Sequence, residues 1–216
     1  MALDFVEGQD LLDVIEAEPT RLGPSEICKI TRKLLDAVTH VHDLDILHRD
    51  ISPDNVLLDR KNEPILIDFG AARDTARRAS RVLSALQVVK DGYSPQEFYL
   101  AGSPQSPAGD LYSLGATLHH LLTGDPPANS HLRLAALAEQ RPDPYQPLKG
   151  RMPGYDDRFL AAIDKALSVV AKDRLQSARD WRELIDGTGS GRTGAAPHAN
   201  EADVAERIRK LVEDTN

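Results

Sequence analysis

Cysteine is almost absent from this chain, which has Cys28 as its single cysteine. One cysteine excludes an internal disulfide and a zinc cluster built from thiolates. Because Cys28 falls among apolar residues of a helical pattern, we expect an inert buried thiol. No segment approaches the roughly 18 consecutive apolar residues of a membrane span, and the N-terminal stretch lacks the charged-then-apolar layout of a signal peptide. We therefore expect a cytoplasmic protein that does not enter a membrane.

Positive charge is also in short supply. The chain has 26 Lys and Arg against 34 Asp and Glu, which gives a net charge of −8. Phosphate backbones are held by concentrated Lys and Arg, so we expect no nucleic-acid partner. The length of 216 residues and the apolar content of 41% suit one domain with a core, or a core with a tail.

The order of the apolar residues predicts a mostly helical chain. An extended strand ends at a glycine over Leu3 to Gly8, and a short helix follows around Leu11 to Glu16. A longer helix comes next, with Ser25 as its cap. From Asp110 to Thr123 the leucines spread over much of the helix surface, which indicates a central buried helix that stops at Gly124.

The composition changes near the end of the chain. We expect a folded body over 1–186, a flexible linker over 187–200 that is rich in Gly, and a short amphipathic helix over 201–216. The apolar side of that helix has two interpretations. It packs locally, or it supports self-association through 201–214.

Two short apolar runs, Val56–Asp59 and Pro64–Ile67, flank four polar residues and predict a β-hairpin with a four-residue loop. If the last residue of the first run pairs with the first residue of the second, Asn55 lies opposite Asp68, about 5 Å away at the backbone. An amide oxygen and a carboxylate beside open space suit Mg²⁺, which completes its shell with water and nucleotide phosphates. Asp50 lies just upstream, where a carboxylate can act as a general base.

These residues form a recognisable set. His48-Arg49-Asp50 with Asn55, followed by Asp68-Phe69-Gly70, resembles the catalytic loop and the metal-binding signature of protein kinases. The stretch "YSPQE", which ends at Glu97, resembles the close of the activation segment in bacterial kinases that are similar to eukaryotic Ser/Thr enzymes. The resemblance implies a protein kinase-like C-terminal lobe, mainly α-helical with small β hairpins.

The resemblance implies catalytic and nucleotide-binding roles. Asp50 would orient and deprotonate the substrate hydroxyl, while Asn55 and Asp68 would hold Mg²⁺, or Mn²⁺, on the phosphates of ATP. The stretch "DFVE" would supply backbone contacts to adenine from Asp4 and Val6.

It also implies structural and regulatory roles. His48 would be structural, and Glu97 would pair with Arg174 near the last helices. Asp110 is expected to act as a helix cap and as a backbone anchor for the catalytic loop.

The segment between Asp68 and Glu97 is basic in an acidic chain. We hypothesise that phosphorylation orders it by charge-assisted bonds to Arg49, at Ser80, Ser84 or Thr75. The alternative is that these basic residues belong to a solvated loop with no regulatory role.

Several parts of a complete kinase are missing from this sequence. It has no glycine-rich loop, no strand lysine and no partner glutamate for that lysine, so the chain resembles a C-terminal lobe that starts at the hinge. Ser52 stands two residues after Asp50, where Ser/Thr kinases usually carry a lysine, and a hydroxyl does not replace that charge. We expect transfer from Mg-ATP to a protein hydroxyl that is incompetent or weak in this isolated lobe.

Two other functions remain open. One is a truncated pseudokinase that presents its helical surface to a partner protein, which the missing lobe and Ser52 favour. The other is a small-molecule phosphotransferase, which Arg49 and Glu97 disfavour.

Overall fold

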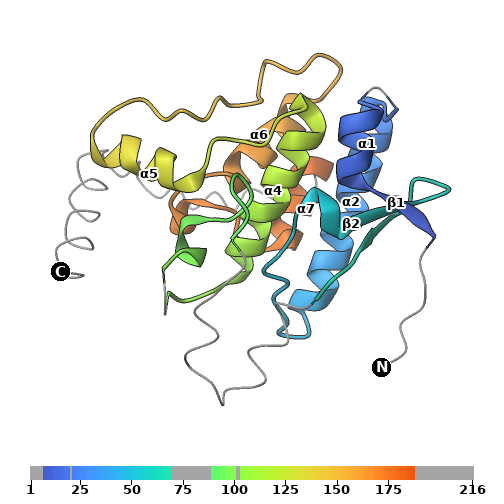
Figure 1. The fold of residues 1–216 in the computed structure, drawn as a ribbon, viewed down its shortest axis with the longest axis horizontal. Coiled ribbons are helices and arrows are strands. Elements are labelled where there is room, and N and C mark those ends of the chain that lie inside the picture. Colours follow the sequence, from blue (N-terminus) through green and yellow to red (C-terminus); the bar gives the residue numbers. More distant parts are fainter. Residues whose placement is uncertain (1–6, 20, 70–88, 101–102, 188–216) are drawn as a thin grey trace.

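The computed structural model describes residues 7–19, 21–69, 89–100 and 103–187. Over these residues the chain is mainly helical with a small sheet, as predicted (Figure 1). No helix among them is long and apolar enough to cross a membrane. Several predicted residues and segments lie outside the described residues: Asp4, Val6, Gly70, Thr75, Ser80, Ser84 and 201–214.

The sheet has three antiparallel strands in the order β1-β2-β3, where β1 is Gly8–Asp10, β2 is Val56–Asp59 and β3 is Pro64–Leu66. The predicted end of the first strand at Gly8 was wrong, because Gly8 begins β1 and pairs with Asp59. A Cβ atom at Gly8 would lie 2.7 Å from the carbonyl oxygen of Leu58. Glycine therefore permits the close approach of these two strands.

The predicted register of the hairpin was wrong by one residue. Leu58 pairs with Pro64, and the backbone N–H of Asp59 donates to the carbonyl of Glu63 at 3.1 Å. The loop between Asp59 and Glu63 is therefore one residue shorter than predicted, and it closes because Asn62 adopts a left-handed conformation with φ of 58°. The Asp59 carboxylate also closes the loop, since it accepts from the N–H of Glu63 at 2.8 Å.

Two helices follow β1. Helix α1 (Leu11–Ala17) is capped by Asp10, and helix α2 (Pro24–His42) starts at a proline. The predicted cap Ser25 was wrong, because the cap residue is Gly23 and Ser25 lies inside the helix. Glu26 takes over the capping interaction, accepting a hydrogen bond from the N–H of Gly23 at 3.1 Å.

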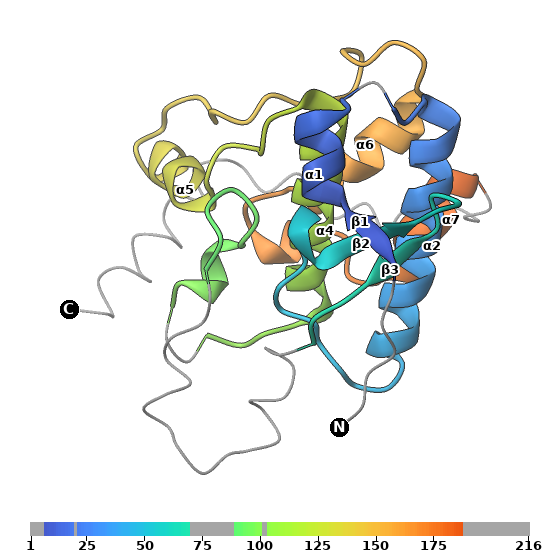
Figure 2. The same cartoon turned by 45° about the vertical axis from the view of Figure 1, so that its right-hand side comes forward.

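Helix α4 (Pro107–Thr123) is the central helix of the described fold. Its residues from Ala108 to His120 are all buried, and Gly124 ends it with φ of 82°. The prediction of a buried helix was therefore confirmed, but the helix begins before Asp110, with Ser106 as its cap. Figures 1 and 2 show α4 between α5 on one side and α2 on the other.

The remaining helices surround α4. They are α5 (Ser130–Ala138), α6 (Asp157–Ala166) and α7 (Ala178–Asp186). Helix α6 packs between α4 and α7, and α7 returns to pack on α2. Trp181 and Tyr112 are among the largest fully buried side chains of this core. Cys28 lies at its edge and is half-buried, and burial raises the pKa of its thiol.

Candidate active site

The loop His48–Asn55, which the sequence predicts to be the catalytic loop, is held by one buried carboxylate from α4. Asp110 is 1% exposed and accepts the backbone N–H groups of His48 at 2.9 Å and of Arg49 at 2.8 Å. The ring of His42 adds a third contact, with its Nε2 2.8 Å from the same carboxylate. Asp110 lies in the first turn of α4 but is not its cap. These contacts hold Arg49 in a left-handed conformation with φ of 68°.

His48 connects the loop to the end of β3. Its Nε2 lies 3.0 Å from the carbonyl oxygen of Ile67, and its Nδ1 accepts the N–H of Asp50 at 3.3 Å. This pattern requires a neutral ring with its proton on Nε2. Burial lowers the pKa of His48, which favours the same neutral form. The structure thus places His48 as a link between the loop and the strand.

Asn55 orients the carboxylate of Asp50. Its side-chain amide donates to the backbone carbonyl of Asp50 at 2.7 Å and to the carboxylate oxygen Oδ2 at 2.9 Å. The short turn η1 (Pro53–Asn55) brings the two side chains together. Because the amide nitrogen faces Asp50, the amide oxygen of Asn55 faces away from it.

Asp68 follows Ile67, the residue just after β3 whose backbone is hydrogen-bonded to Asn55. The N–H of Ile67 donates to the backbone carbonyl of Asn55 at 3.0 Å, so Asp68 lies one residue beyond that pair and not directly opposite Asn55 as predicted. Asp68 has a left-handed backbone conformation with φ of 59°. Burial lowers the pKa of His48, and the negative charge of the Asp68 carboxylate acts in the opposite direction. The structure thus brings Asn55 and Asp68 to the same end of the sheet, next to Asp50.

The oxygen atoms of Asn55 and Asp68 suit a magnesium ion that has few protein ligands. Among the residues that the structure describes, no group of three or more His, Cys, Asp or Glu side chains is placed to hold a metal. An amide oxygen from Asn55 and a carboxylate from Asp68 make a two-ligand set that leaves positions for water and phosphate. That set suits Mg²⁺ brought in with a nucleotide.

A lysine that the sequence analysis missed also reaches this group. Lys90 Nζ lies 2.8 Å from Ser52 Oγ, 2.8 Å from Asp54 Oδ2 and 3.2 Å from Asp50 Oδ1. Lys90 and Ser52 are 38 residues apart, so no local spacing signals the contact. In the sequence Lys90 is one more cation of a basic segment.

The chain after Lys90 is tied to the helical core by a buried ion pair. Arg174 donates to both carboxylate oxygens of Glu97, at 2.6 and 3.1 Å. The same guanidinium donates to the carbonyls of Ser168 and Val169 and lies 4.8 Å from the centre of the Tyr112 ring. Glu97 is therefore fixed against the segment between α6 and α7.

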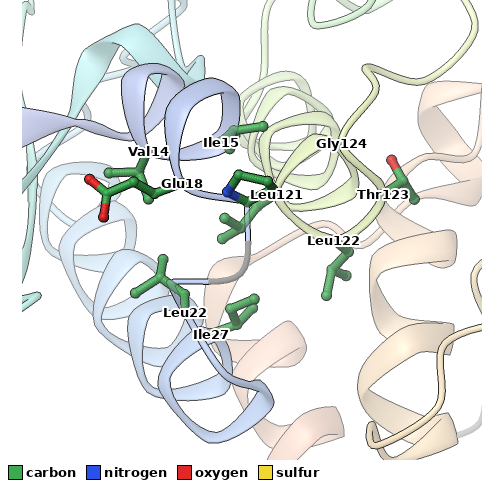
Figure 3. A pocket seen from close by; sticks show the side chains of 10 residues that line it. Val14, Ile15, Glu18, Leu22, Ile27, Leu121, Leu122, Thr123 and Gly124 are labelled. Atoms are coloured by element: carbon green, nitrogen blue, oxygen red, sulfur yellow. The ribbon is translucent and has the colours of Figure 1, made fainter.

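An apolar pocket lies away from these carboxylates. Residues of α1, α2 and the C-terminal end of α4 line it, including Val14, Ile27 and Leu121 (Figure 3). Its volume is about 150 Å³, below the roughly 300 Å³ at which small-molecule sites begin. Leu121 is also about 16 Å along the α4 axis from Asp110, at 1.5 Å per residue. The pocket is therefore not part of the site.

Known proteins that are similar to this chain identify its family. The protein kinase domain family matches residues 1–180. Serine/threonine-protein kinase F of Synechocystis sp. is 31% identical over 198 residues, which cover 90% of this chain and 37% of that protein. Serine/threonine-protein kinase PknA of Nostoc sp. is 32% identical over 188 residues, with coverage of 84% and 31%.

A third relative and a solved structure point to the same family. Serine/threonine-protein kinase PknB of Mycobacterium leprae is 29% identical over 199 residues, which cover 91% of this chain and 31% of that protein. The chain thus spans about a third of the length of these relatives. A structure described as "PpkA-294 apo form" matches with a TM-score of 0.69 and 33% identity, covering 84% of this chain and 61% of that one. This chain therefore belongs to the protein kinase domain family, among relatives that are bacterial serine/threonine kinases.

Proposed function

We propose that this chain carries the catalytic-loop part of a Ser/Thr kinase site and transfers the γ-phosphate of Mg-ATP to a protein hydroxyl. One observation supports this most strongly. The Asn55 amide holds the Asp50 carboxylate at 2.9 Å, while the backbone of Asn55 pairs with the residue before Asp68. The proposed base and the two proposed metal ligands thus share one corner of the fold.

Each of these residues has a distinct role in the proposal. Asp50 accepts the proton of the attacking hydroxyl, and the amide of Asn55 keeps its carboxylate aimed. Asn55 and Asp68 hold Mg²⁺, which neutralises charge on the phosphates when it is bound. His48 and Asp110 position the loop without touching substrate.

Turnover by this chain alone is proposed to be weak. The 216 residues contain no glycine-rich loop and no strand lysine with its glutamate, and these groups position the phosphates and stabilise developing charge in kinases. The proposal also assigns residues 1–186 to a kinase C-terminal lobe and includes a cytoplasmic location, where ATP is available.

Phosphorylation of the activation segment is a further part of the proposal. Arg49 would hold a phosphate at Ser80, Ser84 or Thr75 by charge-assisted hydrogen bonds. Mass-spectrometric mapping of active protein tests this. An active protein with an unmodified segment would contradict it.

The proposed function is tested by measuring Mg-ATP binding and phosphate transfer with the whole chain. Calorimetry with Mg-ATP should show binding that Asp68→Ala weakens at least tenfold, because one of two metal ligands is lost. Radiolabelled ATP with a generic basic protein should give slow transfer that Asp50→Asn abolishes, since the amide does not accept the proton. Transfer that Asp50→Asn leaves unchanged would refute the assigned base.

The same experiment separates the alternatives. Folded chain that binds no Mg-ATP and transfers no label would favour a binding scaffold. Label on an aminoglycoside or a sugar, with none on protein, would favour a small-molecule phosphotransferase. The acceptor that receives the label therefore decides between the two transfer reactions.

A further inference from the structure

In the catalytic loop Arg49 precedes Asp50, but no cation lies between Asp50 and Asn55. Ser52, two residues after Asp50, is fully buried and offers a hydroxyl. A phosphoryl group in transfer carries negative charge and needs positive charge fixed near it. A serine does not supply that charge.

Lys90 brings a cation to the same place from another segment. Its ammonium group lies 2.8 Å from Ser52 Oγ and 3.2 Å from Asp50 Oδ1. The side chain of Lys90 is 25% exposed and that of Asp50 is 16% exposed, so both groups are partly open to solvent. The charge is therefore next to the proposed base and within reach of solvent.

The backbone of Lys90 is fixed by a turn, Lys90–Ser94, which we name the anchor turn. The carbonyl of Lys90 accepts the N–H groups of Tyr93 at 3.0 Å and of Ser94 at 2.9 Å. The N–H of Lys90 donates to Ser94 Oγ at 3.0 Å. Both polar groups of the Lys90 backbone are thus held inside the turn.

The anchor turn is also held by contacts to α4, to α5 and to the loop between them. Tyr93 Oη lies 2.6 Å from Nδ1 of His120 on α4, and Ser130 Oγ donates to the carbonyl of Ser94 at 2.9 Å. Gly92, with φ of 85°, lies so close to Pro126 that a Cβ atom would be 3.0 Å from the Cβ of that proline. The starting point of the Lys90 side chain is therefore set by α4 and α5.

The charges around Lys90 keep it protonated. Burial lowers its pKa, but the hydrogen bond to Asp54 and the charge of Asp50 outweigh burial and raise the pKa above its usual value. Asp54 is 45% exposed, so its carboxylate is well solvated and its bond to Lys90 is the easiest of the three to exchange. An ammonium carries three protons, which allows it to keep Ser52 and Asp50 while a phosphate oxygen replaces Asp54.

We propose that Lys90 contacts the terminal phosphate of ATP in this site and supplies in space the positive charge that Ser52 does not supply from the catalytic loop. The inference rests on the proposed function and names a further catalytic residue for it. Asp54 holds the ammonium in place until the nucleotide arrives. No other described segment is needed for this contact.

The first test compares Mg-ATP with Mg-ADP by calorimetry on the whole chain. Lys90→Met should weaken Mg-ATP at least tenfold and change Mg-ADP less than twofold, because the contact is to the terminal phosphate. Asp54→Asn should tighten Mg-ATP two- to fivefold, since the ammonium loses a competing partner. Lys29→Met is the matched control, because Lys29 also pairs with a carboxylate but lies far out on α2, with 59% of its side chain exposed.

The second test moves the charge. Ser52→Lys combined with Lys90→Ser puts the ammonium back on the catalytic loop, next to the same Asp50. This double variant should recover most of the Mg-ATP affinity that Lys90→Ser alone loses. Far-ultraviolet circular dichroism shows whether each variant is folded, and Asp54→Asn, which leaves Lys90 in place, gives an independent result if Lys90→Met unfolds.

The outcomes separate the inference from the function. If the unmodified chain binds Mg-ATP more tightly than Mg-ADP and Lys90→Met keeps that preference, the inference is wrong and the proposed function stands. Tighter binding of Mg-ATP by Lys90→Met would also overturn it, because Lys90 would then block the site. Binding of neither nucleotide by the unmodified chain would overturn both proposals.

Discussion

The catalytic loop and the anchor turn are both held by α4, but by different chemistry. Near the start of the helix, the buried carboxylate of Asp110 accepts two backbone N–H groups of the loop. Near its end, the neutral ring of His120 meets one phenol of the turn. Charge-assisted hydrogen bonds are roughly twice as strong as neutral ones. One rigid helix therefore positions the loop that carries the proposed base and the turn that carries Lys90, and it holds the loop more tightly.

The largest loss of stability is expected at the buried ion pair of Arg174 and Glu97, which follows the anchor turn. Arg174→Met leaves Glu97 buried without its partner, and we expect a loss of about 3–5 kcal/mol in the free energy of unfolding. Urea denaturation measures it. Arg179→Met is the control, because Arg179 forms an exposed pair with Asp43 that is worth about 0–1 kcal/mol. Similar losses in the two variants would show that burial does not strengthen the Arg174 pair.

The contacts between α4 and the catalytic loop are disrupted by a substitution at Asp110. Asp110→Asn keeps the size but turns an amide NH₂ toward backbone donors, so we expect a loss of about 2–3 kcal/mol and a loss of Mg-ATP binding. Urea denaturation and calorimetry measure the two effects. Asp36→Asn is the control, since Asp36 is 64% exposed on α2. A stable Asp110→Asn variant with normal nucleotide affinity would mean that the loop holds its own shape.

A smaller effect on the anchor turn is expected at Gly92. Gly92→Ala and Gly150→Ala share the cost of a left-handed conformation, roughly 1–2 kcal/mol, because both glycines have positive φ. They differ in that the new Cβ at Gly150 meets nothing within 4 Å, whereas at Gly92 it meets Pro126 and Pro127. Gly92→Ala should therefore cost more in urea denaturation. Equal costs would show that the prolines yield and the turn is loosely held.

The smallest effect is expected from protonation of His120. Burial lowers the pKa of His120, while burial raises the pKa of Tyr93 to about 12, so the phenol keeps its proton and donates to the neutral ring. The folded pKa of His120 thus lies below the unfolded value of about 6.5. Its contribution to stability is complete above that value and decreases as the pH falls below it toward the folded pKa.

His48 and His119 share this direction because burial lowers the pKa of each. The pH dependence of unfolding between about pH 5 and 7.5 should therefore weaken, but not vanish, in His120→Gln, whose amide oxygen still accepts from Tyr93. Urea denaturation at several pH values measures it. A pH profile identical to that of the unmodified chain would exclude His120 as a titrating anchor.

The hairpin shows how far local spacing reaches. The alternation of apolar and polar residues identifies β2 and β3, because side chains on a strand alternate between two faces. The register depends on whether Asn62 adopts a left-handed conformation, and asparagine tolerates either choice. The predicted pair of Asn55 with Asp68 was therefore one residue off, although both residues do lie at the same end of the sheet.

Helix starts show a similar limit. Ser25 and Asp110 are residue types that cap helices, yet Gly23 and Ser106 are the caps. Asp110 lies one turn inside its helix because its carboxylate is used by the N–H groups of a loop about 60 residues earlier in the chain. A capping preference of about 1 kcal/mol is smaller than the cost of leaving those buried donors unpaired.

The sequence by itself determined the helical class, the buried central helix and the motif residues of the catalytic loop. Those features depend on periodicity and on spacing over a few residues, which the chain carries locally. Only the tertiary structure decided that Lys90 stands beside Ser52, 38 residues away in the chain. The pair of Arg174 with Glu97, 77 residues apart, was expected from the family resemblance and from no local pattern. Such contacts form because packing around α4 brings distant segments together, and no local preference of either segment encodes the distance between them.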